Sequence, residues 1–260
     1  MENKLKFLLI LLLSGVFCVW SISNIISYES AEFWSNTTTL AISSILLVAC
    51  IVNNFKIGIK GMHGKAWVLF TLAIATWYIA ELLWVEQESS DFVDSELYAN
   101  IFWFVGYGLY FLFGIMYLKP FSHQISKKNI LATSFMILPI LFTVIYTIEP
   151  QFYTSENILN ASYPIADSIM LIPSILGTML FFKGRVKFAW STIFFGMIVF
   201  VIADYGFMYF NYIEEYYAGH VTDLLYIWAY AILIIGVIAN LNILKRTNKN
   251  TPFNDQSTMR

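Results

Sequence analysis

The chain has 260 residues, of which 58% are apolar and only 12% are charged. A hydrocarbon core about 30 Å thick needs roughly 20 apolar residues per helix, and the apolar stretches of this chain leave loops too short for a soluble domain. The net charge of -2 sums 15 basic and 17 acidic residues that occupy different loops, so it indicates no nucleic-acid partner. The composition predicts an integral membrane protein.

The apolar stretches predict an all-α, polytopic protein with eight transmembrane helices. In chain order they cover about 6–28, 37–56, 66–86, 97–118, 129–148, 162–182, 187–211 and 222–244. The first stretch lacks a small-x-small cleavage site, so we expect a retained helix and not a signal peptide, with a mature chain of seven helices as the alternative. The polar residues 245–260 are expected to form a disordered cytoplasmic tail.

The basic residues predict the orientation of these helices. With the N-terminus in the cytoplasm, all 15 Lys and Arg residues fall on the inner side, which is the bias that sets membrane topology. We therefore expect a multi-pass cell-membrane protein whose termini are both cytoplasmic. The predicted outer loops are acidic, and their acids are Glu29, Glu32, Glu86, Glu88, Asp91, Asp94, Glu96, Glu149, Glu156, Glu214 and Glu215.

The acidity of the outer loops does not by itself indicate a cation site, because a loop without Lys and Arg is left with acids and amides. Two N-x-S/T sequons, at Asn36 and Asn160, lie on the predicted outer side, and the sequence leaves open whether either is glycosylated. The three histidines fall on different sides of the membrane and the two cysteines lie within apolar stretches. No metal site, no cofactor and no enzymatic activity are expected.

The two halves of the chain share polar landmarks at an offset of 123 residues. Residues 1–118 and 119–244 therefore read as two four-helix repeats, which run in the same direction because four is even. The matched positions are Ala80-Glu81 with Ala203-Asp204, Asn100 with Asp223, Trp103 with Tyr226, and Tyr107 with Tyr230.

Four carboxylates lie within or at the entry to predicted helices, in the outer part of the membrane. An ionised side chain in a bilayer is costly, so such positions are paired or functional. Aromatic side chains surround them, a composition typical of a pocket for a cationic or amphipathic ligand, although a polar clamp between helices uses the same residues. The candidate ligand-binding residues are Glu81, Asp167, Asp204 and Asp223, with Tyr107, Tyr230, Trp77 and Trp84.

Short motifs in the second half resemble a known sensor region. They are Tyr163-Pro164-Ile165-Ala166-Asp167, Ile202-Ala203-Asp204-Tyr205, Ala218-Gly219-His220 and Asp223-Leu224-Leu225-Tyr226, followed by Tyr230. This succession is similar to the N-terminal multi-helix membrane sensor region of bacterial diguanylate cyclases and some sensor histidine kinases. The resemblance covers about 70–240, but Ala229-Tyr230 stands where that region has G-Y, and we expect no output domain.

The resemblance implies a sensory module that signals through a separate partner. We therefore expect a membrane-embedded sensory or ligand-binding protein with an outward-facing acidic and aromatic pocket for an external small ligand, cation or proton. A small-solute or proton-coupled transporter and a structural membrane subunit are the alternatives. Apart from the lipid bilayer, the expected partners are that ligand and a membrane or cytoplasmic signalling protein.

Overall fold

The fold is a bundle of long helices. The computed structural model describes residues 2–89, 95–148, 155–181 and 187–250, and the statements below concern these residues. The helices are α1 (Glu2–Ile26), α2 (Tyr28–Ile57), α3 (Gly61–Ser89), α4 (Ser95–Leu118), the short 3-10 helix η1 (Lys119–Gln124), α5 (Lys127–Ile148), α6 (Ser155–Phe181), α7 (Lys187–Tyr212) and α8 (Val221–Asn250).

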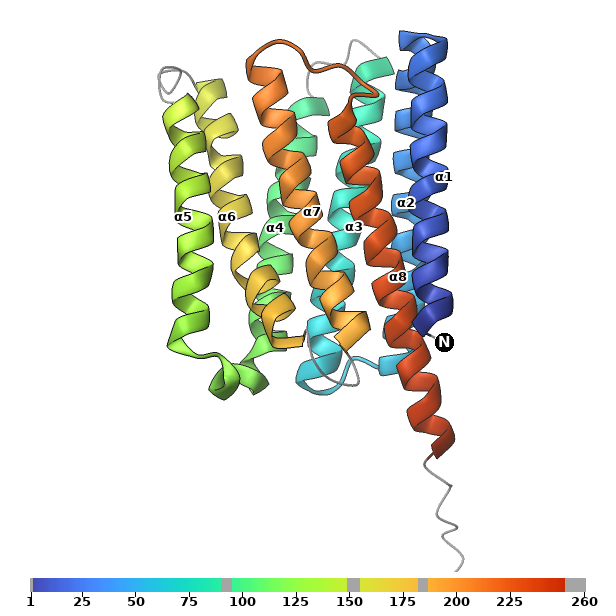
Figure 1. Ribbon diagram of the computed structural model, residues 1–260, viewed down its shortest axis with the longest axis vertical. Helices are drawn as coiled ribbons and strands as arrows, with labels where there is room; N and C mark the ends of the chain where they lie inside the picture. The colour runs from blue at the N-terminus through green and yellow to red at the C-terminus, as the bar shows by residue number, and fades with distance from the viewer. Residues whose placement is uncertain (1, 90–94, 149–154, 182–186, 251–260) are drawn as a thin grey trace, which may run out of the picture.

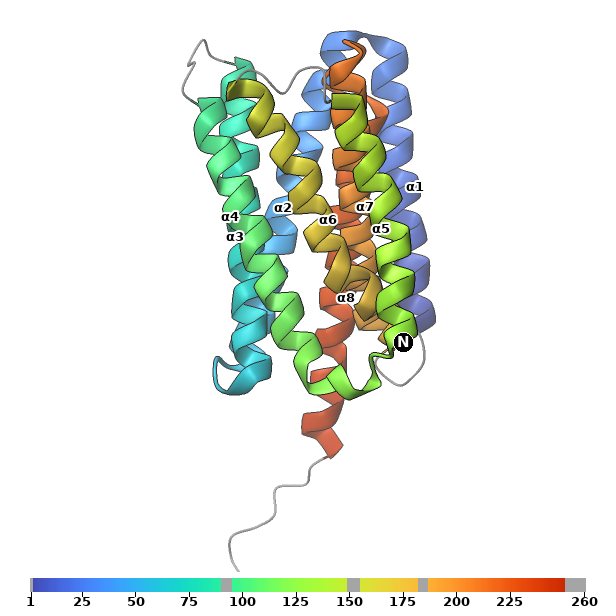
Figure 2. The same ribbon diagram turned by 90° about the vertical axis from the view of Figure 1, so that its left-hand side faces the viewer.

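The helices run alternately up and down the bundle, with α1 and α5 at its opposite edges (Figure 1). In the described residues α3 packs on α4, α7 on α8, α2 on α3 and α6 on α7; α2 also contacts α8, and α4 contacts α6. α8 is the most enclosed of the membrane-length helices and projects beyond the others at the end that carries the N-terminus (Figure 2). It continues to Asn250, six residues past the predicted boundary at 244.

Seven helices of the described part are long and apolar enough to cross a membrane, and α5 is not among these seven. The prediction of a helical protein with helices able to cross a membrane is confirmed for the described residues, whereas insertion into a membrane and the count of eight spans stay predictions. Large apolar side chains cover the outside of the bundle, as on α1 and α5, where Phe7 is 68% and Leu131 72% exposed. Such a surface is suited to lipid tails and would be unfavourable in water.

The connection between α1 and α2 differs from the prediction. α2 begins nine residues before the predicted start at 37, because the Ser27 hydroxyl caps it by accepting a hydrogen bond from the Ser30 amide at 3.1 Å. Glu29 and Glu32 therefore lie in the first turns of α2 and not in an outer loop. The acidic first turn suits the positive end of the helix dipole.

Basic residues gather at the end of the bundle that carries the N-terminus, which we call the basic end. The opposite end, the acidic end, carries Glu29, Glu86 and Glu214, with no Lys or Arg among its described residues. The basic residues at the basic end include Lys4, Lys6, Lys56, Lys60, Lys65, Lys119, Lys127 and Lys128.

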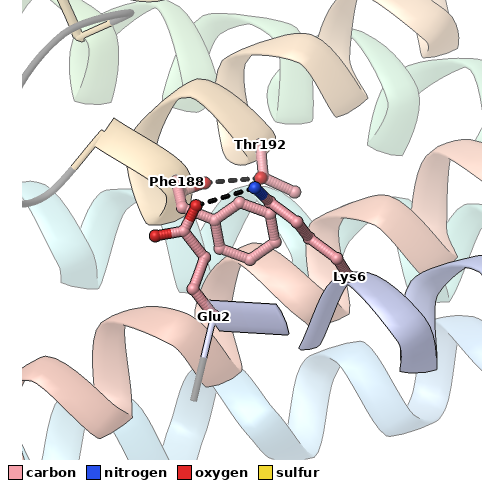
Figure 3. Close-up of polar contacts among 4 residues, drawn as sticks. All are labelled: Glu2, Lys6, Phe188 and Thr192. Carbon is pink, nitrogen blue, oxygen red and sulfur yellow. Dashed lines mark hydrogen bonds and ion pairs between the residues drawn. The ribbon is translucent and has the colours of Figure 1, made fainter. Parts of the chain in front are cut away.

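The start of α1 contacts the start of α7 at the basic end (Figure 3). The Lys6 ammonium lies 2.9 Å from the Glu2 carboxylate and 5.7 Å from the centre of the Phe188 ring. The Thr192 hydroxyl donates to the Phe188 carbonyl. The ion pair is half exposed and adds little stability, and the packing of α1 on α8 and α2 places α1 in the bundle.

Large rings fill the half of the bundle nearer the basic end. The Trp190 ring stacks on Tyr117 at a centroid distance of 3.5 Å and lies 5.3 Å from Trp67. All of these rings are buried, and large aromatic side chains dominate the energetics of such a core. We call this cluster the aromatic plug, and its members are Trp67, Phe70, Phe113, Tyr117, Trp190 and Phe194.

Candidate functional site

A cavity of about 670 Å³ opens in the half of the bundle nearer the acidic end. Side chains from α2, α3, α4, α6, α7 and α8 line it, together with the segment that joins α7 to α8. Its walls carry the acids Glu81, Asp204, Glu214 and Asp223 among many aromatic rings, and no Lys, Arg or His is among the lining residues. The cavity therefore has a negative field with no internal counter-charge.

Asp204 on α7 is held by two tyrosines from other helices. The Tyr107 hydroxyl on α4 donates to Oδ2 at 2.9 Å, and the Tyr226 hydroxyl on α8 donates to Oδ1 at 2.5 Å. Asp204 is only partly buried, and it lines the cavity. Hydrogen bonds to a charged acceptor are strong, so these tyrosines fix the carboxylate while part of it faces the open space.

Glu81 on α3 is held in the same way from the other half of the chain. The Tyr230 hydroxyl on α8 donates to its Oε1 at 2.8 Å. Glu81 and Asp204 are 123 residues apart, as are Tyr107 and Tyr230. Each half of the chain therefore supplies a tyrosine to the acid of the other half, a cross-pairing that the matched spacing could not specify by itself.

Asp223 lines the cavity but also organises the segment between α7 and α8. Its Oδ2 accepts hydrogen bonds from the Gly219 amide at 2.7 Å and from the Ser35 hydroxyl at 3.0 Å, and its Oδ1 accepts one from Tyr216 at 3.1 Å. On the far side, the Trp20 indole donates to the Gly219 carbonyl at 2.7 Å. Asp223 is thus a structural anchor of the cavity rim.

Gly219 is required at this rim. Its φ of +93° lies in the region that favours glycine, and a Cβ there would meet the Ala31 Cβ at 2.7 Å. His220 follows it, and burial lowers the pKa of its imidazole, an effect that Glu215 partly opposes. Because its pKa lies below the usual value, His220 is neutral at neutral pH and adds no positive charge beside the cavity.

Asp167 on α6 lies behind the cavity wall. It is 0% exposed and is not a lining residue, and neither of its carboxyl oxygens has a hydrogen-bond donor. It is near enough to Asp204 and Tyr107 to interact with both electrostatically. The predicted acids are therefore gathered at one site, but Asp167 belongs to the second layer of it.

The predicted aromatic residues divide between wall and floor. Trp84 lines the cavity, whereas Trp77 and Tyr230 do not. Trp77 is fully buried and stacks on Phe200 at a centroid distance of 5.2 Å. Trp77 thus supports the cavity from beneath, and Tyr230 acts through its hydrogen bond to Glu81.

Several lining residues were not among the predicted ones. Asn100 accepts a hydrogen bond from the Tyr163 hydroxyl, and both side chains line the cavity with Trp103 and Tyr226. Asn100, Trp103 and Tyr226 could have been predicted from the repeat, because Asn100 matches Asp223 and Trp103 matches Tyr226 at the offset of 123 residues. Asn36 of the first sequon is also a lining residue, whereas the side chain of Asn160 lies outside the described ones.

A metal centre has no ligand set in the described residues, where no three His, Cys, Asp or Glu side chains group to hold an ion. Comparison of the chain with protein-family models, curated proteins and solved structures found no match.

Proposed function

We propose that the protein is a membrane-embedded binding module for a small organic cation, which enters the cavity from the acidic end. The observation that carries the proposal is the cavity itself. It has four acids, many aromatic rings and no basic residue in its lining. A quaternary or protonated amine gains from both kinds of side chain, because ring faces attract cations and a low dielectric strengthens the pull of each carboxylate.

The size of the cavity fits this ligand class. About 670 Å³ lies within the range of pockets that enclose small organic molecules. Trp84 on α3 and Phe207 on α7 meet edge to face with ring centroids 6.2 Å apart, and both line the cavity one turn from Glu81 and Asp204. A cation in the cavity beside this pair would meet aromatic ring surface and the negative charge of the two carboxylates.

The proposal includes the internal duplication, which is supported by the contacts between α3 and α7. Three pairs of rings that contact each other across these helices are each 123 residues apart in the chain. The helix contacts repeat at the same offset, since α2 packs on α3 and α8 as α6 packs on α7 and α4. The ring pairs are Trp67 with Trp190, Trp77 with Phe200, and Trp84 with Phe207.

The proposed orientation of the protein in the membrane follows from the distribution of charge between its basic and acidic ends. Lys and Arg are retained on the cytoplasmic side of membrane proteins, so the basic end is proposed to be cytoplasmic and the cavity to face outward. α8 carries Tyr226 and Tyr230 to the two acids and extends beyond the bundle at the basic end. A change in the charge of Glu81 or Asp204 would therefore act on α8, which is placed to reach a separate signalling partner.

Binding is favoured over transport by the aromatic plug. A carried solute would have to pass between its buried rings, among them the stacked Trp190 and Tyr117. Few polar groups lie beside the plug: Asn240 donates to Asn53 and Asn54 donates to Thr71, while Nδ2 of Asn53 and Oδ1 of Asn54 have no hydrogen-bond partner. A transporter would need a second state in which these rings separate.

The test is the thermal stability of the detergent-purified protein with quaternary ammonium ions, from tetramethylammonium to tetrabutylammonium, and with choline. A ligand that binds only the folded state raises the unfolding temperature with concentration. We expect a saturable rise for at least one of these cations and none for 3,3-dimethylbutan-1-ol, the neutral isostere of choline. A rise that is equal for the isostere, or no rise with any of the cations, would overturn the proposal.

Variants separate the cavity from non-specific effects. Asp204→Asn and Glu81→Gln remove the negative charges with little change in shape, and both should abolish the rise. Glu29→Gln removes an exposed acid in the first turn of α2, outside the cavity lining, and should retain it. If all three variants behave alike, the cations act on the bulk charge of the protein and not on the cavity.

A further inference from the structure

Asp167 has no hydrogen-bond donor, unlike the acids held at the cavity wall. Donors to the wall acids include Tyr230 for Glu81, Tyr107 and Tyr226 for Asp204, and Ser35, Tyr216 and the Gly219 amide for Asp223. Asp167 on α6 is fully buried, and both of its oxygens lack a donor. An ionised carboxylate that is buried without donors is strongly unfavourable. A protonated Asp167 avoids this cost, because it carries no charge and its O–H can donate a hydrogen bond.

The hydroxyl hydrogens around Asp167 are all directed elsewhere. Those of Tyr107 and Tyr226 point to Asp204, and that of Tyr163 points to Asn100. The Tyr205 hydroxyl pairs with Ser168 and with the Pro164 carbonyl. A phenol has one hydrogen and an ionised carboxylate has none, so none of these groups can donate to Asp167 while it keeps its present partner.

The charged neighbours of Asp167 offer no cation. Asp204 faces it from α7 and Tyr107 from α4, while Tyr205 and, from α8, Tyr226 lie near enough to interact with it. α5 also packs against α6, but its basic residues, Lys127 and Lys128, lie in its first turn at the basic end. Within the described residues, the nearest charged partner of Asp167 is therefore another carboxyl group.

We propose that Asp167 and Asp204 form a buried proton-binding site in which the two carboxyl groups share one proton. Asp167 is the neutral acid, and its O–H donates to the Asp204 carboxylate, which leaves both oxygens of Asp204 free to accept from the tyrosines as well. Two adjacent carboxylates cannot both ionise without a large cost. The proton-binding site needs no ligand in the cavity, so it can be tested independently of the binding function proposed above.

Release of the proton has a defined route. Asp204 lines the cavity and Asp167 does not, so the proton passes from the Asp167 oxygen to the Asp204 oxygen and then to water in the cavity. Both carboxyl groups are then ionised and the negative field of the cavity is stronger. The proton thus sets how strongly the cavity attracts a cation, and a bound cation would favour its release.

Infrared spectroscopy of the ligand-free protein tests the site. At about pH 7 an ordinary aspartate is ionised, so we expect a carboxylic C=O stretching band that shifts in D2O and upon labelling with ¹³C-aspartate. Asp167→Asn should lose this band and keep its fold, because the amide replaces the neutral acid and donates to Asp204. Glu29→Gln should retain the band. A labelled wild-type protein without the band would overturn the proposal even if the variant failed to fold.

The pH dependence of stability gives a second readout. The folded protein holds a proton that the unfolded chain releases once the pH exceeds the ordinary pKa of aspartate, about 4, so raising the pH from about 5 to 8 should lower the unfolding temperature of the wild type. Asp167→Asn has no such proton, and its unfolding temperature should fall less over the same range. Equal falls in both proteins would assign the effect to other groups and overturn the shared-proton site.

Discussion

The hydrogen bond between Tyr107 and Asp204 gives the sharpest test of the geometry at the cavity. Tyr107 is only 5% exposed and its hydroxyl lies 2.9 Å from Oδ2 of Asp204. A hydrogen bond to a charged acceptor contributes about 1.5–3 kcal/mol. In Tyr107→Phe the ring still fills the space, so we expect a loss of about 2 kcal/mol in the free energy of unfolding, with little cavity cost. Tyr226 still holds Oδ1, so the variant should fold.

Thermal unfolding can be followed with a thiol-reactive dye. Cys50 is fully buried while Cys18 is exposed, so a Cys18→Ser background reports unfolding through Cys50 alone. A loss of about 2 kcal/mol corresponds to a fall of about 4–8 °C in the unfolding temperature for a chain of this size. Tyr230→Phe, the matched change at Glu81, should give a fall of similar size.

A double-mutant cycle assigns the effect to the pair. With Asp204→Asn as background the hydrogen bond is neutral, and Tyr107→Phe should cost only about 1 kcal/mol. If the cost is the same in both backgrounds, the hydroxyl does not act through the Asp204 charge. An unchanged unfolding temperature in the single variant would refute the hydrogen bond itself.

Other predictions concern the rim, the helix packing and the orientation. Gly219→Ala places a Cβ 2.7 Å from Ala31 at a φ of +93°, and it should destabilise the protein by about 2 kcal/mol in the same dye assay. Gly108→Ala places a Cβ with no atom within 4 Å, and it should change stability by less than about 1 kcal/mol. Gly106→Ala would place a Cβ 2.3 Å from the Trp77 indole and should cost about 1–3 kcal/mol; equal unfolding temperatures for the Gly106 and Gly108 variants would contradict the packing. Reporter fusions after Gln124, in the η1 connection, should be active only for a cytoplasmic reporter, and activity of an exported reporter there would reverse the proposed orientation.

The fold was predictable where apolar length decides it. Long apolar stretches gave the helices and their order, because each must satisfy its backbone internally. The start of α2 was not predictable from hydropathy, because the charged residues Glu29 and Glu32 lower the local hydropathy as loop residues do. Their helical state depends on the Ser27 cap and on how tightly α1 turns into α2.

The site was predictable in part. Regular spacing within each half identified Glu81, Asp204, Tyr107 and Tyr230, and the structure joins them by hydrogen bonds. Spacing could not tell that each tyrosine reaches the acid of the other half, because that choice depends on how the helices are arranged in space. The burial of Asp167 depends likewise on α7 packing over α6, which no local pattern in the sequence encodes.

The central claim is that an organic cation occupies the acidic and aromatic cavity. The most direct measurement is an experimental structure of the protein with tetraethylarsonium, whose arsenic can be located by anomalous scattering. The cavity account predicts a single strong peak among the rings of Trp84 and Phe207, near the carboxylates of Glu81 and Asp204, and its loss in Asp204→Asn. A cavity without arsenic at a saturating concentration, or a peak that persists unchanged in the variant, would contradict it.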